Sequence, residues 1–135
     1  MPGDAADIET TLQDGEIITS FFIPVAAWTR RSLFLKIRDR ESYEFALASA
    51  VVALDLNEGK VRDARIALGG VATIPWRATA AESAVMGKAI SDATKKAAAD
   101  AAFAGARTHE YNAFKVELGK RTLMRALDQV AAMEI

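Results

Sequence analysis

Three cations, Lys36, Arg38 and Arg40, stand at alternate positions in one short stretch of the chain. In an extended chain, alternate side chains project from one face at intervals of about 6.6 Å, so these charges could together meet an anion. Acidic side chains that could neutralise part of this charge lie close by in sequence, at Asp39, Glu41 and Glu44. An ordinary solvated strand face is therefore the favoured interpretation, and isolated surface ion pairs there would contribute about 0–1 kcal/mol.

The other side chains that could do chemistry stand alone. His109, the only histidine, lies in the polar run Arg107-Thr108-His109-Glu110, where a surface role is favoured over proton transfer. Ser42 and Ser49 have no histidine and acid partner in a recognisable nucleophile pattern, and the carboxylates show no paired spacing. We predict no catalytic residue. Without cysteine, and with one histidine, the chain is also predicted to hold no metal centre.

Gly69-Gly70 follows a predicted strand, and the backbone amides of such a turn can bind phosphate. The turn leads into VATIP instead of a helix N-terminus, so we do not predict a dinucleotide site. A strand end, a bulge or a close approach of another segment is the favoured interpretation. Trp76 and Arg77 come next, and these residue types often anchor interfaces, although Trp76 could equally cap the core.

Composition predicts one soluble globular domain over residues 1–135, with a flexible lead-in at residues 1–12. Of the 135 residues, 51% are hydrophobic and 26% are charged, enough apolar surface for one core. The net charge of -1 provides no cationic field for nucleic acid, which excludes that partner. The apolar runs fall far short of the ~20 residues that span a bilayer, and the start MPGDAADIE is acidic. We therefore predict no membrane partner and no targeting signal.

Strand patterns come first and helix patterns follow, which predicts an α+β fold. The predicted strands cover residues 16–23, after the turn signal QDG and before Pro24, then 32–38, 45–56 and 61–69. The residues NEGK between the last two predict a hairpin turn. The predicted helices cover residues 79–86 and 91–104, the latter between Ser91 and Gly105, and a third that begins near Thr108. One face of this third helix carries Val116, Leu123, Leu127 and Val130, and Gly119 predicts a close backbone approach.

Four blocks in order resemble the C-terminal domain of the FAD-binding (medium) subunit of the molybdenum hydroxylases. They are GEIITSFFIP, RRSLFLKIRDRESYEFALASAVVAL, RDARIALGGVATIPWRATAAE and YNAFKVELGKRTLMRAL, within residues 4–132. The segments SYEFALASAVVALDL and GGVATIPWR are most similar in sequence to the aldehyde oxidoreductase and xanthine dehydrogenase branch. The group also contains carbon monoxide dehydrogenase. The resemblance implies a small antiparallel sheet of three to four strands packed against three C-terminal helices.

The resemblance also implies a function as part of an oxidoreductase. Electrons would pass from a molybdenum-cofactor subunit through the clusters of an iron–sulfur subunit to FAD, and then to an acceptor such as NAD or oxygen. This domain would close one side of the flavin site, and FAD would be shared with an absent N-terminal FAD-binding domain. By position, Ile18 and Lys36 align with places near the flavin ring, and the RDRES segment with a loop beside it. The isolated chain is expected to be inactive.

A different interpretation is a freestanding interaction module without a cofactor, or a homodimer that buries the surface otherwise covered by the missing domain. Both would be colourless, and they differ in whether the mass depends on concentration. The subunit interpretation predicts instead an exposed apolar or mixed patch where the N-terminal domain docks. It also implies a cytoplasmic location, or a periplasmic one after export with a partner subunit.

Overall fold

The structure, a computed structural model, describes residues 7, 8, 10–41 and 43–135. Its centre is one antiparallel sheet of four strands in the order β1-β2-β3-β4. The strands are β1 (Ser32–Ile37), β2 (Ala48–Asn57), β3 (Lys60–Gly69) and β4 (Trp76–Arg77). A short 3-10 helix, η1 (Ala27–Arg30), precedes β1. The prediction of an α+β fold with three to four antiparallel strands is confirmed.

The hairpin between β2 and β3 forms where the sequence predicts it. Asn57 pairs with Lys60, and the two residues between them have positive φ, 50° at Glu58 and 75° at Gly59. This combination matches the two-residue turn whose twist suits a β-hairpin. The strands β2 and β3 that this turn joins are the two longest strands and form the centre of the sheet.

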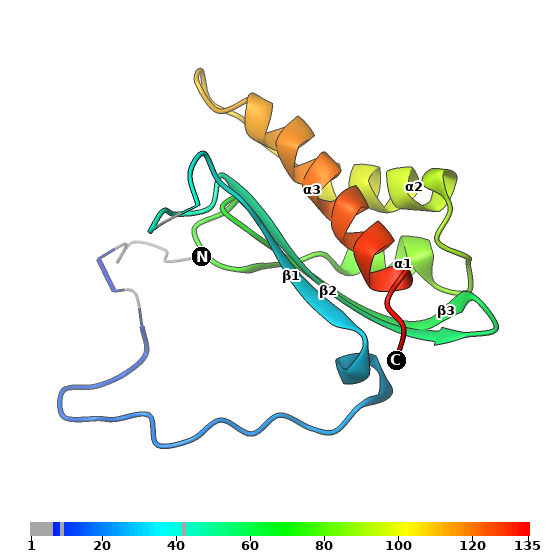
Figure 1. The fold of residues 1–135 in the computed structure, drawn as a ribbon. Coiled ribbons are helices and arrows are strands. Elements are labelled where there is room, and N and C mark those ends of the chain that lie inside the picture. Colours follow the sequence, from blue (N-terminus) through cyan, green and yellow to red (C-terminus); the bar gives the residue numbers. More distant parts are fainter. Residues whose placement is uncertain (1–6, 9, 42) are drawn as a thin grey trace.

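Three helices lie on one face of the sheet (Figure 1). They are α1 (Thr79–Val85), α2 (Asp92–Phe103) and α3 (Phe114–Ala131). Helix α3 packs on β1 and β2, α1 packs on β3, and α2 packs on both other helices. The core between the layers is aliphatic, and its largest fully buried side chains are Val52, Leu54, Val61, Ile66, Val85, Leu123, Leu127 and Val130.

Local contacts explain where two of the helices begin and end. The Ser91 hydroxyl accepts a hydrogen bond from the Thr94 amide at 3.2 Å, which caps α2 as predicted. The Arg31 guanidinium donates to the carbonyls of Val130 at 3.2 Å and Ala131 at 3.3 Å. A cation at these terminal carbonyls stabilises the C-terminus of α3 and ties it to the start of β1.

Gly119 lies where α3 meets the end of α2. A Cβ atom at this position would come within 2.3 Å of Cζ of Phe103. The predicted close approach is confirmed, and the neighbour is an aromatic ring.

The prediction of a strand over residues 16–23 is wrong. The turn before it forms, with the Glu16 amide bonded to the Gln13 carbonyl at 3.0 Å and Gly15 at φ 84°. The residues that follow, however, pair with no strand in the described part of the chain, and Figure 1 draws them well clear of the sheet. A strand requires a partner for its backbone groups, and the sheet offers this segment none.

Two boundaries also differ from the predictions. The strand expected from residue 45 begins at Ala48, and Phe45 is exposed. The helix expected near Thr108 begins at Phe114, because the Asn112 side chain accepts from the His109 amide at 2.7 Å and holds residues 109–112 in a turn. The predicted flexible lead-in, residues 1–12, falls largely outside the described residues. Within the described part, no helix is both long and apolar enough to cross a membrane.

Candidate functional site

Lys36 lies one residue before the end of β1 and is half-buried. Its ammonium group donates a hydrogen bond to the backbone carbonyl of Glu44, on the far side of the loop that joins β1 to β2. A carbonyl is a neutral acceptor, so this bond orients the ammonium group without cancelling its charge. The side chain therefore presents a positioned cation at the β1–β2 loop.

The β1–β2 loop is closed by its own hydrogen bonds. The Glu44 carboxylate accepts from the backbone amides of Asp39 at 3.0 Å and Arg40 at 2.9 Å. The Arg40 guanidinium donates to the carbonyl of Tyr43 at 3.1 Å, and Tyr43 has the uncommon φ of 34°. The Glu44 carboxylate thus satisfies two backbone donors of the loop, in addition to lying near the cations in sequence.

The three cations do not share one strand face. The extended backbone stops at Ile37, so Arg38 and Arg40 lie in the loop and are exposed. The expected spacing fails because it required a strand that continued through Arg40. Only Lys36 keeps the orientation that the strand pattern predicted.

Ile18 lies in the extended segment that precedes η1, and its side chain is largely exposed. This segment runs clear of β1 in Figure 1, so the structure does not bring Ile18 and Lys36 together. Neighbouring large apolar side chains of the segment are exposed as well, at Ile17, Phe21, Phe22, Ile23 and Val25. Residues 17–25 thus form an exposed stretch rich in large apolar side chains.

Gly69 and Gly70 serve packing. A Cβ at Gly69 would come within 2.5 Å of the Ser49 hydroxyl, and one at Gly70, where φ is 71°, within 2.9 Å of the Ala46 carbonyl. The loop then continues to β4 and not directly into a helix. The turn therefore lacks the helix N-terminus whose backbone amides commonly bind a pyrophosphate, and it does not fit that kind of phosphate site.

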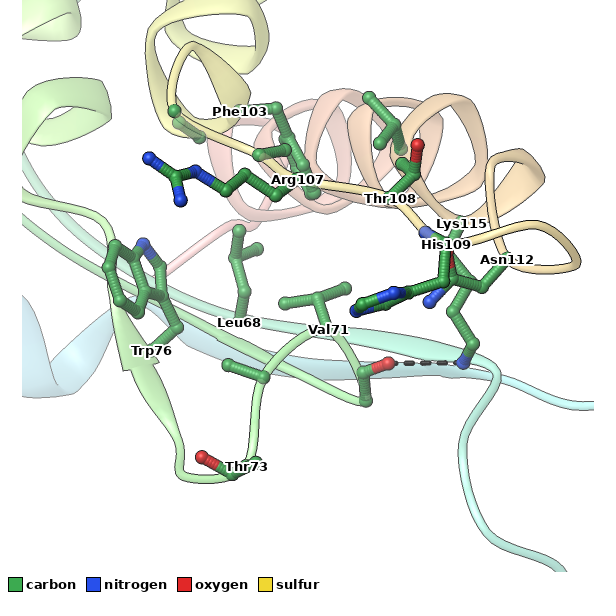
Figure 2. A pocket seen from close by; sticks show the side chains of 16 residues that line it. Leu68, Val71, Thr73, Trp76, Phe103, Arg107, Thr108, His109, Asn112 and Lys115 are labelled. Atoms are coloured by element: carbon green, nitrogen blue, oxygen red, sulfur yellow. Dashed lines mark hydrogen bonds between the residues drawn. The ribbon is translucent and has the colours of Figure 1, made fainter. Parts of the chain in front are cut away.

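A cavity of about 550 Å³ opens between the β3–β4 loop and the connection from α2 to α3. Figure 2 shows Trp76 and Arg107 at one end of it, and His109 and Lys115 at the other. The sequence patterns did not predict this site. Its two walls are about 35 residues apart in the chain, and no local spacing links them.

Ion pairs between α2 and α3 lock the two helices that bound this cavity. The Asp100 carboxylate on α2 binds the ammonium groups of Lys120 on α3 and Lys96 on α2, both at 2.6 Å. These hydrogen bonds, first that of Lys120, lower the pKa of Asp100 from 3.8 to about 2. Lys95 bridges the same helices through Asp128, and its two carboxylate partners raise the pKa of its ammonium group.

Comparisons with known proteins agree with the fold. Residues 34–130 match the family described as the CO dehydrogenase flavoprotein C-terminal domain. The aldehyde oxidoreductase FAD-binding subunit PaoB of Escherichia coli (strain K12) is 39% identical over 97% of this chain and 38% of that protein. The glyceraldehyde dehydrogenase medium chain of Sulfolobus acidocaldarius is 32% identical over 62% of this chain and 29% of that protein.

A solved structure has the same architecture. It is carbon monoxide dehydrogenase from Hydrogenophaga pseudoflava lacking the Mo-pyranopterin moiety of its molybdenum cofactor, with a TM-score of 0.69 and 33% identity. The similarity covers 75% of this chain and 36% of that one. The chain belongs to the CO dehydrogenase flavoprotein C-terminal domain family, within the molybdenum hydroxylase flavoproteins. It spans well under half the length of these relatives.

Proposed function

We propose that this domain closes one side of the FAD site in a molybdenum hydroxylase and supports electron transfer from iron–sulfur clusters to FAD and on to an acceptor. The observation that carries this proposal is the similarity to an FAD-binding subunit, which extends over 97% of the chain. The similarity includes the extended segment before β1, which lies outside the matched family range.

FAD would be shared with an N-terminal FAD-binding domain. That domain would supply the phosphate site, because the Gly69-Gly70 turn of this chain does not fit one. The molybdenum cofactor and the iron–sulfur clusters would belong to two partner subunits. The six exposed apolar side chains of residues 17–25 support this arrangement, since an unpaired extended segment can add a strand to a neighbouring sheet.

Lys36 would set the electrostatics beside the flavin ring. When bound, FAD supplies the two-electron redox centre, and reduction adds electron density to its ring. A positive charge held close to the ring stabilises that density. The bond from Lys36 to the Glu44 carbonyl supports this role because it positions the ammonium group without neutralising it. Ile18 would contact the ring once the extended segment, which here runs clear of β1, packs against the assembled flavin site. The RDRES loop, of which residue 42 lies outside the described residues, would flank the ring.

Replacing Lys36 tests this role in the complete subunit. We expect Lys36→Met to lower the midpoint potential of bound FAD by about 30 mV, which corresponds to about 1.4 kcal/mol for a two-electron couple. Lys36→Arg keeps the charge and should keep most of the potential. Lys60→Met is the matched control, because Lys60 is exposed at the hairpin far along the sheet. Equal potentials in Lys36→Met and Lys60→Met would remove the assignment.

Ile18 is tested by retention of the cofactor. We expect Ile18→Ala in the complete subunit to weaken FAD binding, whereas Ile8→Ala removes a similarly exposed isoleucine from the lead-in and should not. Equal FAD content after gel filtration of both variants would argue against a flavin contact at Ile18.

A non-catalytic interaction module, including a homodimer, is the second candidate. The same exposed segment favours it, because a second copy could cover Phe21, Phe22 and Ile23. Sedimentation equilibrium distinguishes the candidates. A mass that doubles with concentration, and that stays doubled when the N-terminal domain is present, would favour the homodimer over the flavin subunit.

A further inference from the structure

The cavity beside Trp76 has the size and shape of a small-molecule site. Its volume of about 550 Å³ falls inside the range of about 300–1,000 Å³ that is typical of ligand pockets. It is a hollow between two loops, residues 70–76 and 104–113, on the side of the sheet that carries the helices (Figure 2). None of its lining residues belongs to the segment 36–46 that contains Lys36 and its loop.

The floor of the cavity is apolar and firmly held. Leu68 and Phe103 are buried, while Val71 and Val116 are half-buried. The tip of the Phe103 ring packs against Gly119 of α3, which holds the ring in place at the cavity. The floor is therefore a preformed surface on which a flat apolar body can lie.

The polar groups of the lining carry only positive charge. Arg107 and Lys115 are cations, and none of the lining residues in the described chain is Asp or Glu. The Lys115 ammonium group donates to the carbonyls of Leu47 at 2.8 Å and Gly70 at 3.1 Å, both neutral acceptors. Arg107 is exposed and takes part in none of the ion pairs found between described residues. The cavity thus has one cation at each end, and neither takes part in an ion pair between described residues.

Trp76 and one of the two cations, Arg107, lie at the same end of the cavity. Trp76 is half exposed in the edge strand β4, and Figure 2 places its indole on the same side of the cavity as the Arg107 side chain. An aromatic ring stacks favourably beside an indole, and an acidic group pairs with a guanidinium, so this end of the cavity offers partners for both parts of an aromatic acid.

We propose that this cavity binds a small, flat aromatic anion, with the ring on the apolar floor beside Trp76 and the acidic group at Arg107. The proposal is independent of the flavin role, because it rests on residues that lie outside the Lys36 loop. It assigns function to two loops that the flavin proposal leaves unused.

Tryptophan fluorescence provides a direct test. The chain has two tryptophans, so the Trp28→Phe variant reports on Trp76 alone. The probe is 4-nitrobenzoate, a flat aromatic anion that quenches indole, and the control is the neutral 4-nitrobenzamide. We expect saturable quenching by the anion with an affinity about tenfold tighter than that of the amide. Quenching that stays linear in both probes would overturn the proposal.

Two pairs of variants in the Trp28→Phe background locate the site. Arg107→Gln should weaken 4-nitrobenzoate binding about tenfold, the loss expected for one charge-assisted hydrogen bond. Arg125→Gln removes the same charge from an exposed position of α3 outside the cavity and should have little effect. Ala72→Phe fills the cavity from an exposed lining position and should abolish binding, whereas Ala80→Phe, exposed on α1, should not. Equal effects within either pair would contradict the proposal.

The assembled protein supplies the last outcome. If the complete flavin subunit in its complex retains saturable binding that Arg107→Gln weakens, the site is open to a small ligand. If the isolated chain binds the probe and the complex does not, a protein segment fills the cavity, and the small-ligand proposal fails.

Discussion

The segment at residues 16–25 and helix α3 both carry several large apolar side chains, yet only α3 buries such side chains fully. Leu127 of α3 is 0% exposed, whereas Phe22 of the segment is 90% exposed. The difference lies in the partners, because α3 packs on β1, β2 and α2, and the segment pairs with no described strand. A hydrophobic pattern therefore predicts that a surface is buried, but not that its partner belongs to the same chain.

Truncating one side chain in each region gives the largest expected difference in stability between the two regions. Leu127→Ala should lower the free energy of unfolding by about 2–5 kcal/mol, because it leaves a cavity in a closed core. Phe22→Ala in the isolated chain should change it by less than about 0.5 kcal/mol, as for exposed sites generally. Urea denaturation followed by circular dichroism measures both.

A large loss of stability in isolated Phe22→Ala would show that the segment packs on its own domain. The segment would then not differ from α3 in having a partner within the domain, and the proposal that it forms a docking surface would be wrong. In the complete subunit, by contrast, we expect Phe22→Ala to reduce the association of the two domains.

Gly119 tests how tightly the core is packed where α3 meets α2. An added Cβ there meets the Phe103 ring at 2.3 Å, so Gly119→Ala should destabilise the domain by about 1–3 kcal/mol despite the better helix propensity of alanine. Gly105→Ala is the matched control, because nothing lies within 4 Å of its added Cβ. Thermal unfolding of the two variants measures the difference, and equal midpoints would show that Phe103 moves aside without cost.

The smallest expected effect concerns the ion pairs between α2 and α3. The folded state holds the pKa of Asp100 near 2, below the ordinary 3.8, chiefly through Lys120 and then through Lys96. A lowered carboxyl pKa stabilises the folded state fully above about pH 4, and this stabilisation is lost as the pH falls toward about 2. Asp100→Asn should therefore be slightly less stable than the parent protein at pH 6. The difference in the free energy of unfolding between the two proteins should be smaller at pH 3.

Urea midpoints at the two pH values measure this difference. Glu117→Gln is the control, because its ion pair is the exposed one with Arg121 within α3, and it acts on Lys96 only over a longer distance. A difference for Asp100→Asn that stays constant between pH 6 and pH 3 would contradict the assigned role of the pair.

Elements with local signals could be predicted from the sequence. The turn at Glu58-Gly59 follows from residues that tolerate positive φ, and the start of α2 from the capping hydroxyl of Ser91. The later start of α3 was missed because the Asn112 side chain competes with the helix for the local backbone amide. The strand predicted at residues 16–23 failed for a different reason, since none of the described strands pairs with this segment.

The sites follow the same rule. The resemblance singles out Lys36, but the bond from its ammonium group to the Glu44 carbonyl spans eight residues and follows from no sequence pattern. The cavity was missed entirely, because Trp76 and Arg107 reach the same cavity only through the packing of the helices on the sheet and on one another. Tertiary packing creates such a site, and local sequence periodicity does not predict it.

The most direct test of the central claim is the flavin absorbance of this chain, purified alone and after co-expression with the N-terminal FAD-binding domain from the same source. We predict no bound FAD in the isolated chain and a stable complex with FAD in the mixture, which Phe22→Ala weakens. Absence of both association and flavin in the mixture would contradict the account, and would remove Ile18 and Lys36 as flavin contacts.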